Sequence, residues 1–210
     1  MLYHVLLGNI KSRRRILITG GMHAREWITT LLIYNLIHKY KRLNLKNVCF
    51  VFVPCCNPNG LYLATHFKKY KLYKNNGNNV DINKNFDCKW ELGGKFKGKF
   101  PQSEWETRDI LAIIEKYKPT ASLAFHSKGE IIYYKKYTSL ANILSKYCGY
   151  KIVESKTSFG GLSDFLNQHD IPSFTIEVGS DKLHHPITPR HLPSIIRQVR
   201  LLPLVLSYLI

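Results

Sequence analysis

Apolar residues in this chain form four short runs that predict buried strands. The runs lie near residues 14–20, 48–54, 120–126 and 172–178. Each run is apolar at successive positions rather than at alternate ones, which is typical of strands that are covered on both faces in a parallel or mixed sheet. The pattern therefore predicts a sheet with helices on both sides.

Five longer segments with helix-forming patterns alternate with these runs. They lie near residues 26–43, 103–117, 138–148, 161–169 and 189–209. Alternation of strands and helices is typical of α/β folds. We therefore expect a three-layer α/β sandwich whose mixed, largely parallel sheet is covered by helices. No repeat or linker divides the chain, so we expect a single domain over residues 1–210.

Residues 55–101 interrupt the alternation and are rich in turn-forming residues. Asn57-Pro58-Asn59-Gly60, Asn75-Asn76-Gly77-Asn78-Asn79 and Gly93-Gly94 favour turns and loops. Long loops in a compact domain usually carry function or are disordered. We expect this segment to form loops that contribute residues to a functional site.

The chain is strongly basic. It has 31 Lys and Arg against 14 Asp and Glu, a formal net charge of +17. Such a field attracts polyanions, and both nucleic acid and anionic cell-wall polymer are candidates. The basic residues are dispersed and no nucleic-acid motif is present, so we expect no specific nucleic-acid partner. A composition rich in lysine and asparagine also results from coding bias, which leaves the meaning of the charge open.

Targeting signals are weak. Residues 1–8 lack the basic and long apolar regions of a signal peptide. The chain contains no apolar run of about 18 residues, so we expect no membrane-spanning helix. The five cysteines are an odd number without paired spacing, which indicates reduced thiols: Cys49, Cys55, Cys56, Cys88 and Cys148. We expect a cytoplasmic protein, with cell-wall or spore association open and the oligomeric state unknown.

Histidine and glutamate residues follow three of the predicted strands. His23 and Glu26 come after the first run, His126 ends the third and Glu177 ends the fourth. Imidazole nitrogen and carboxylate oxygen are the ligands of catalytic zinc, which keeps one position for water. Singly, His126 could be a core histidine and Glu177 a salt-bridged glutamate. Because ligands bind at the carboxyl ends of strands in open α/β sheets, we expect one shared site.

Five motifs carry a family resemblance. They are Gly-Gly-Met-His-Ala-Arg-Glu-Trp at 20–27, Asn-Pro-Asn-Gly at 57–60, Val-Asp-Ile-Asn-Lys-Asn-Phe at 80–86, Phe-His-Ser at 125–127 and Phe-Thr-Ile-Glu at 174–177. In this order they resemble the zinc carboxypeptidases of the carboxypeptidase A type, over nearly all of residues 5–200. Residues 125–134 and 174–186 look more like one bacterial branch. That branch is the γ-D-glutamyl-L-diamino acid endopeptidases, which cut peptidoglycan stem peptides.

The resemblance implies one zinc ion per chain, bound by His23, Glu26 and His126. A carboxylate beside zinc could be either ligand or base, and the family pattern makes Glu26 the ligand and Glu177 the general base. The resemblance also places Asp81 against the N–H of His23, the alternative being an aspartate that only shapes a turn. Since His23 comes earlier here than in family domains, we expect an N-terminally shortened domain.

The resemblance further implies a cation that stabilises the oxyanion. Counting from Asn57-Pro58-Asn59-Gly60, this cation is Lys74, with Lys71 as the alternative. The family's exopeptidases hold a terminal carboxylate with Asn-Arg, whereas this chain has Asn83-Lys84. Lysine cannot form the planar bidentate fork of arginine.

Four further positions are implied to contact substrate. Lys128 replaces the exopeptidase tyrosine that follows the His-Ser pair, of which Ser127 is the second member. Ser163 occupies the specificity-pocket position, and Arg25 faces neighbouring substrate carboxylates. These differences favour a substrate that has carboxylates away from the scissile bond.

We therefore expect a zinc-dependent peptidase that hydrolyses amide bonds of the γ-D-glutamyl-diaminopimelate type, with a cell-wall stem peptide as its partner. One alternative is a metallocarboxypeptidase that removes C-terminal residues from ordinary peptides. The other is a truncated, non-catalytic zinc-binding module, which the early first histidine and the charge of +17 suggest.

Overall fold

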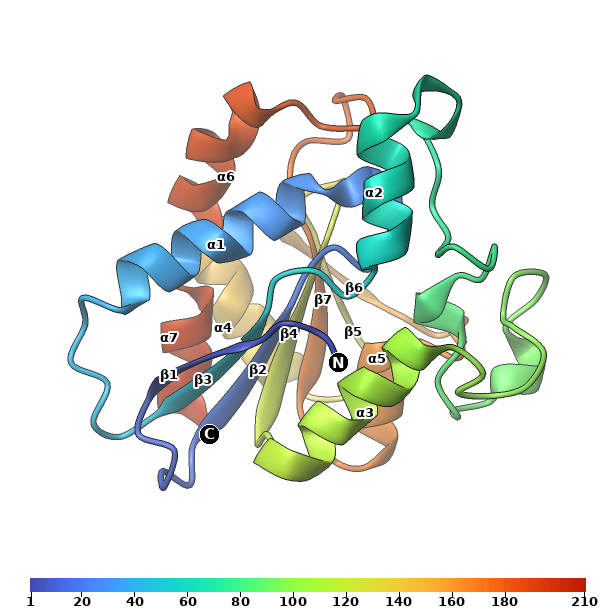
Figure 1. The fold of residues 1–210 in the computed structure, drawn as a ribbon. Helices are drawn as coiled ribbons and strands as arrows, with labels where there is room; N and C mark the ends of the chain where they lie inside the picture. The colour runs from blue at the N-terminus through green and yellow to red at the C-terminus, as the bar shows by residue number, and fades with distance from the viewer.

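The computed structural model describes residues 1–210. Seven strands form one sheet in the order β1-β3-β2-β4-β7-β5-β6 (Figure 1). Four neighbouring pairs are parallel, and the β1–β3 and β5–β7 pairs are antiparallel. The strands are β1 Val5–Gly8, β2 Arg15–Thr19, β3 Cys49–Val53, β4 Ala121–His126, β5 Ile131–Tyr134, β6 Lys151–Glu154 and β7 Ser173–Glu177.

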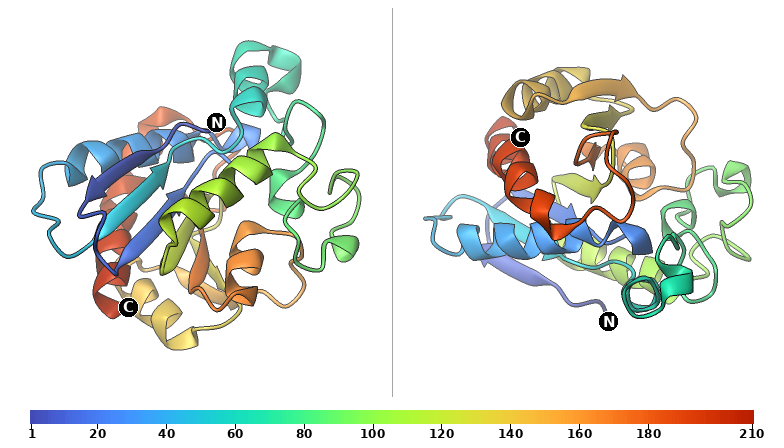
Figure 2. Two further views of the ribbon diagram at one scale, coloured as in Figure 1. Left: turned by 60° about the horizontal axis from the view of Figure 1, so that its bottom comes forward. Right: turned by 90° about the horizontal axis from the view of Figure 1, so that it is seen from above.

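Helices cover both faces of this sheet (Figure 2). On one face lie α1 Ile28–Tyr40, α4 Thr138–Cys148, α6 Leu192–Val199 and α7 Leu202–Leu209. On the other face lie α3 Trp105–Tyr117 and α5 Leu162–Gln168, while α2 Pro58–His66 packs beside the turn that precedes α1. The expected three-layer α/β sandwich with a mixed, largely parallel sheet is confirmed.

The sheet separates two hydrophobic cores. Ile16 and Ile18 of β2 point into a cluster of 26 buried residues, and Leu17 points into a cluster of 14 on the opposite face. Successive side chains of a strand point to opposite faces. Strands with a core on each side therefore need apolar residues at every position, which explains the uninterrupted runs in the sequence.

The secondary structure departs from the expectations at several places along the chain. β1, β5 and β6 do not follow from the hydrophobic pattern, because each has four residues and is only partly buried. Residues 55–101 are rich in loops, as expected, but they also contain α2, where the Asn57 side chain caps the helix by accepting from Gly60 N at 2.9 Å. The expected single helix over residues 189–209 is also wrong. It breaks between α6 and α7, where Pro203 has no N–H to continue the hydrogen-bond ladder.

The segment Pro189–Leu209 is long and apolar enough, by length and composition alone, to cross a membrane. Its mean hydropathy is 1.2, and 33% of it is buried. The buried positions Ile195, Val199, Leu202 and Leu206 belong to the larger core. One such segment is weak evidence for a span, because a core helix passes the same test.

Candidate active site

The predicted site residues meet at the carboxyl edge of the central strands. His23 and Glu26 follow β2, and Glu26 lies in a short 3₁₀ turn, Ala24–Glu26, that leads into α1. His126 is the last residue of β4 and Glu177 the last of β7. The parallel register of these two strands pairs His126 with Glu177. Residues far apart in the chain therefore become direct neighbours.

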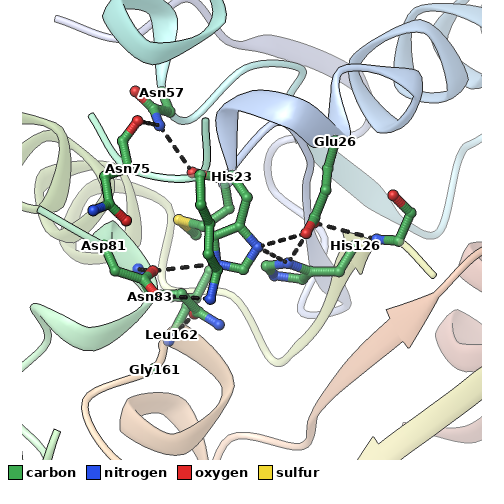
Figure 3. Close-up of polar contacts among 12 residues, drawn as sticks. His23, Glu26, Asn57, Asn75, Asp81, Asn83, His126, Gly161 and Leu162 are labelled. Atoms are coloured by element: carbon green, nitrogen blue, oxygen red, sulfur yellow. Dashed lines mark hydrogen bonds and ion pairs between the residues drawn. The ribbon is translucent and has the colours of Figure 1, made fainter. Parts of the chain in front are cut away.

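His23, Glu26 and His126 form a buried group with converging donor atoms (Figure 3). The distance from His23 Nδ1 to Glu26 Oε1 is 2.9 Å, and His126 Nδ1 lies 3.2 Å from both Glu26 Oε2 and His23 Nδ1. Ligand atoms about 2.0–2.2 Å from a tetrahedral zinc lie roughly 3.3–3.5 Å from one another. Both the spacing and the two-imidazole, one-carboxylate donor set therefore fit one zinc ion with a position left for water.

Asp81 fixes the orientation of His23. With the His23 proton on Nε2, this nitrogen donates to Asp81 Oδ1 at 3.2 Å, and Nδ1 is left facing the other two donors. Lys74 Nζ makes an ion pair with Asp81 Oδ2 at 2.8 Å. Burial opposes ionisation of Asp81, but His23 and Lys74 hold its pKa well below the usual range. Asp81 is therefore an ionised carboxylate shared by His23 and Lys74.

Protons compete with a metal ion for this group. Burial would lower the pKa of His23, but the facing Glu26 and Asp81 carboxylates raise it to about 9. Burial lowers the pKa of His126, although Glu26 opposes this shift. Since imidazole must be neutral to ligate, metal binding has to displace the His23 proton and weakens as the pH falls.

Glu177 has no structural partner for one of its oxygens. Oε2 is buried without a hydrogen bond. Burial, followed by the nearby Glu26 carboxylate, raises the pKa of Glu177 to about 8, against the effects of His23, Lys74 and Arg25. A carboxylate that is not used by the fold and lies next to a metal-binding group is suited to proton transfer.

This raised pKa predicts a pH-dependent stability effect in the metal-free protein. The unfolded chain ionises Glu177 near its ordinary pKa of 4.5, but the folded chain does so only near 8. The contribution of Glu177 to the free energy of unfolding is therefore fully present below pH 4.5 and is lost as the pH rises through about 8. We expect Glu177→Gln and wild type to melt at similar temperatures near pH 5, and the variant to melt higher near pH 8.5. Thermal melts with a chelator test this, and an equal difference at both pH values would contradict it.

A cavity of about 510 Å³ opens beside the metal-binding group. His23, Lys74, Asp81, Lys84 and Glu177 all line it. The rest of the lining is mostly polar and includes Asn83, Ser155, Thr157, Ser158 and Thr175. A cavity with two lysines and many hydroxyl groups favours a polar, anionic ligand.

The Asn83-Lys84 turn is held firmly against the start of α5. Asn83 Oδ1 accepts a hydrogen bond from Leu162 N at 3.0 Å. Gly160 has a φ of +74°, and a Cβ there would lie 2.5 Å from the Lys84 carbonyl oxygen. The Lys84 ammonium makes no ion pair, so its charge is free to meet a ligand in the cavity.

The other predicted contact residues, Arg25, Ser127, Lys128 and Ser163, do not line this cavity. Ser127 N donates to Glu26 Oε2 at 3.2 Å, whereas the Lys128 ammonium bonds the Asp181 carbonyl oxygen. Ser163 bonds the hydroxyls of Ser173 and Thr175 in a smaller adjoining cavity. Arg25 has a buried Nε without a partner, and its charge acts on Glu177. The alternative cation, Lys71, does not line the catalytic cavity.

Asparagine residues that the sequence indicated only as turn formers hold Lys74 and Asp81 in place. Asn57 Nδ2 donates to the carbonyl oxygens of Met22 and Asn75, at 3.2 and 3.1 Å. The Asn76 amide nitrogen donates to Glu104 Oε2 at 2.8 Å, and its oxygen accepts from Val80 N at 3.0 Å. The turn-forming residues of both motifs can be recognised in the sequence, whereas their distant hydrogen-bond partners cannot.

Comparisons with known proteins agree with this geometry. A family model described as zinc carboxypeptidase matches residues 6–147. γ-D-Glutamyl-L-diamino acid endopeptidase 1 from Lysinibacillus sphaericus is 27% identical over 235 aligned positions, which cover 88% of this chain and 59% of that protein.

Two solved structures share the fold. Thrombin activatable fibrinolysis inhibitor superimposes with a TM-score of 0.86 at 19% identity, over 99% of this chain and 65% of that one. Murein-tripeptide amidase MpaA from Escherichia coli O157 superimposes with a TM-score of 0.69 at 18% identity, over 96% and 83%. The chain spans less than two thirds of the length of the Lysinibacillus relative and of the fibrinolysis inhibitor.

Proposed function

The chain belongs to the zinc carboxypeptidase family, and from this premise we propose that it is a zinc peptidase that cleaves γ-D-glutamyl-diaminopimelate bonds in peptidoglycan stem peptides. One observation carries the proposal. Glu177 presents an unpartnered oxygen beside the His23, Glu26 and His126 donors, in a cavity where Lys84 has no carboxylate partner. The name of the Lysinibacillus relative supports the substrate class.

Each residue has a distinct part in the proposed mechanism. Zinc, when bound by His23, Glu26 and His126, acts as a Lewis acid and lowers the pKa of water toward ~7. Glu177 accepts the proton of the attacking water and delivers it to the leaving amine. Asp81 accepts from His23 Nε2 and so keeps His23 Nδ1 facing the Glu26 and His126 donors that would hold the ion with it. Lys74, whose ammonium pairs with Asp81 Oδ2 at 2.8 Å, lines the same cavity, where its charge also stabilises the negative charge that develops on the former carbonyl oxygen.

Lys74→Ala is expected to lower kcat more than it raises KM. Lys74 lines the catalytic cavity, and its backbone carbonyl accepts from Ala24 N at 3.0 Å, which fixes its distance from the metal-binding turn. A cation that meets charge present only in the transition state contributes to kcat, and losing one such donor costs about 10²–10³-fold. Steady-state kinetics give both constants, with the exposed Lys71→Ala as the matched control. A change confined to KM would place Lys74 in ground-state binding.

We also expect strong discrimination between substrates. A γ-D-glutamyl-diaminopimelate peptide offers several carboxylates around its scissile bond, whereas hippuryl-Phe and hippuryl-Arg offer one. Hydrogen bonds to charged groups contribute roughly 1.5–3 kcal/mol each before screening by solvent. We expect kcat/KM for the stem peptide to exceed that for either hippuryl substrate by at least about tenfold. Lys84→Ala should reduce this ratio, and equal or faster hippuryl cleavage would favour the carboxypeptidase alternative.

The alternatives have less support from the residues. A plain carboxypeptidase would hold a terminal carboxylate with a planar fork, and the Lys84 ammonium cannot form one. A non-catalytic zinc-binding module would need no general base, yet Glu177 keeps a free buried oxygen beside the metal-binding group.

A further inference from the structure

A second hollow adjoins the catalytic cavity. Its volume is about 840 Å³, and Gly94 lines both spaces. The neighbouring Gly93 packs against the Lys84 backbone, since a Cβ on Gly93 would lie 3.5 Å from the Lys84 carbonyl oxygen. Gly94 therefore lies at the boundary of the two spaces, and the second space is lined by residues 94–100, part of the green loop at the right of Figure 1.

This loop has a fixed shape. Trp90 Nε1 and Asn85 Nδ2 both donate to the Lys97 carbonyl oxygen, at 2.7 and 2.8 Å. Asp81 N donates to the Phe96 carbonyl oxygen at 2.7 Å, so the loop is tied directly to the residue that orients His23. The second hollow is therefore built onto the catalytic scaffold.

Cations and aromatic rings line the second hollow. Lys95 and Lys99 make no ion pair, whereas the Lys97 ammonium bonds the Glu91 carbonyl oxygen and lies 4.2 Å from the centre of the Trp90 ring. Phe96 is 41% exposed and Phe100 is 57% exposed. The single acid in the lining, Glu104, has both oxygens occupied by the side chains of Asn76, Asn78 and Ser103.

We propose that this hollow binds the leaving part of the substrate beyond its first residue, as an acidic peptide. The inference rests on the proposed function, in which Lys84 meets a carboxylate of the leaving diaminopimelate. A substrate that ends there would leave Lys95 and Lys99 unused. A longer leaving peptide carries its terminal carboxylate past Gly94 to these two lysines and its apolar atoms to the exposed phenylalanine rings.

An acidic peptide suits the hollow better than nucleic acid does. Proteins that bind nucleic acid through its backbone contact on the order of 6–10 phosphates. Here two free ammonium groups lie in a hollow that shares Gly94 with the catalytic cavity. The limited charge and this shared boundary favour the same peptide that enters the catalytic cavity.

A peptide series tests the proposal. Three substrates share the acyl part L-Ala-γ-D-Glu, and their leaving parts are diaminopimelate, diaminopimelyl-D-Ala and diaminopimelyl-D-Ala-D-Ala. A fourth is the longest peptide with an amidated C-terminus. We expect kcat/KM to rise about three- to tenfold along the series, as exposed charge contacts allow, and the amide to lose most of this gain. Lys95→Ser/Lys99→Ser should remove the rise and keep the shortest peptide within about twofold of wild type.

The controls separate the possible failures. Lys41→Ser/Lys46→Ser removes the same charge from exposed positions in the loop that follows α1 and should preserve the rise. A flat or falling series, or an equal loss on all peptides in Lys95→Ser/Lys99→Ser, overturns this inference while the proposed function stands. Cleavage of hippuryl substrates without any stem-peptide cleavage removes both. A different outcome would assign the hollow to nucleic acid. In that outcome a single-stranded oligonucleotide inhibits the wild type but not Lys95→Ser/Lys99→Ser, and kcat/KM does not change with peptide length.

Discussion

Glu177→Gln is expected to lower kcat on the stem peptide by about 10²–10⁴-fold, while the protein keeps its zinc. Glutamine has nearly the same shape but cannot accept the proton of the attacking water or pass it to the leaving amine. Zinc should remain because its donors come from His23, Glu26 and His126, and the Glu177 Oε2 atom bonds none of them. Single-turnover kinetics with metal analysis of the same sample measure both quantities.

A matched control is Glu154→Gln, which removes the same charge from an exposed position on β6. This variant should turn over as wild type does. Near-wild-type turnover in Glu177→Gln would mean that another group serves as the base. Loss of zinc together with activity would instead make Glu177 part of the metal site.

His126→Ala is expected to abolish stoichiometric zinc and, with it, measurable activity. His126 Nδ1 lies 3.2 Å from both Glu26 Oε2 and His23 Nδ1, so its removal takes one of three converging donors. Loss of a residue that merely orients a ligand costs about 10–100-fold in metal affinity, and loss of a ligand should exceed that range. Metal analysis after dialysis against metal-free buffer tests this expectation.

The control for this variant is His66→Ala, which alters an exposed histidine on α2 and should retain one zinc per chain. Because His126 is buried, circular dichroism and a thermal melt must show that His126→Ala is folded. Asp81→Asn should give an intermediate result, since it removes only the acceptor for His23 Nε2. Full zinc retention in a folded His126→Ala protein would exclude this residue from the metal site.

The central strands and the chemical groups of the site can be predicted from the amino-acid sequence alone. β2, β3, β4 and β7 were predictable because a strand with a core on each face must be apolar at every position, a requirement that is written locally in the chain. The turn after β2 was informative for a similar reason. There, His23 and Glu26 stand three residues apart, a short separation that itself limits how far their donor atoms can lie from one another.

Which of these residues contact one another depends on the three-dimensional fold. The β4–β7 register pairs His126 with Glu177, and the fold of the 73–81 loop brings Lys74 into the cavity rather than Lys71. The fold also turns the Lys128 ammonium toward Asp181 and places Gly94 in the lining of two hollows. Such contacts depend on pairings between distant segments, which no local pattern records. β5 and β6, at four residues each, are too short to show a periodicity, so their places follow from the sheet they complete.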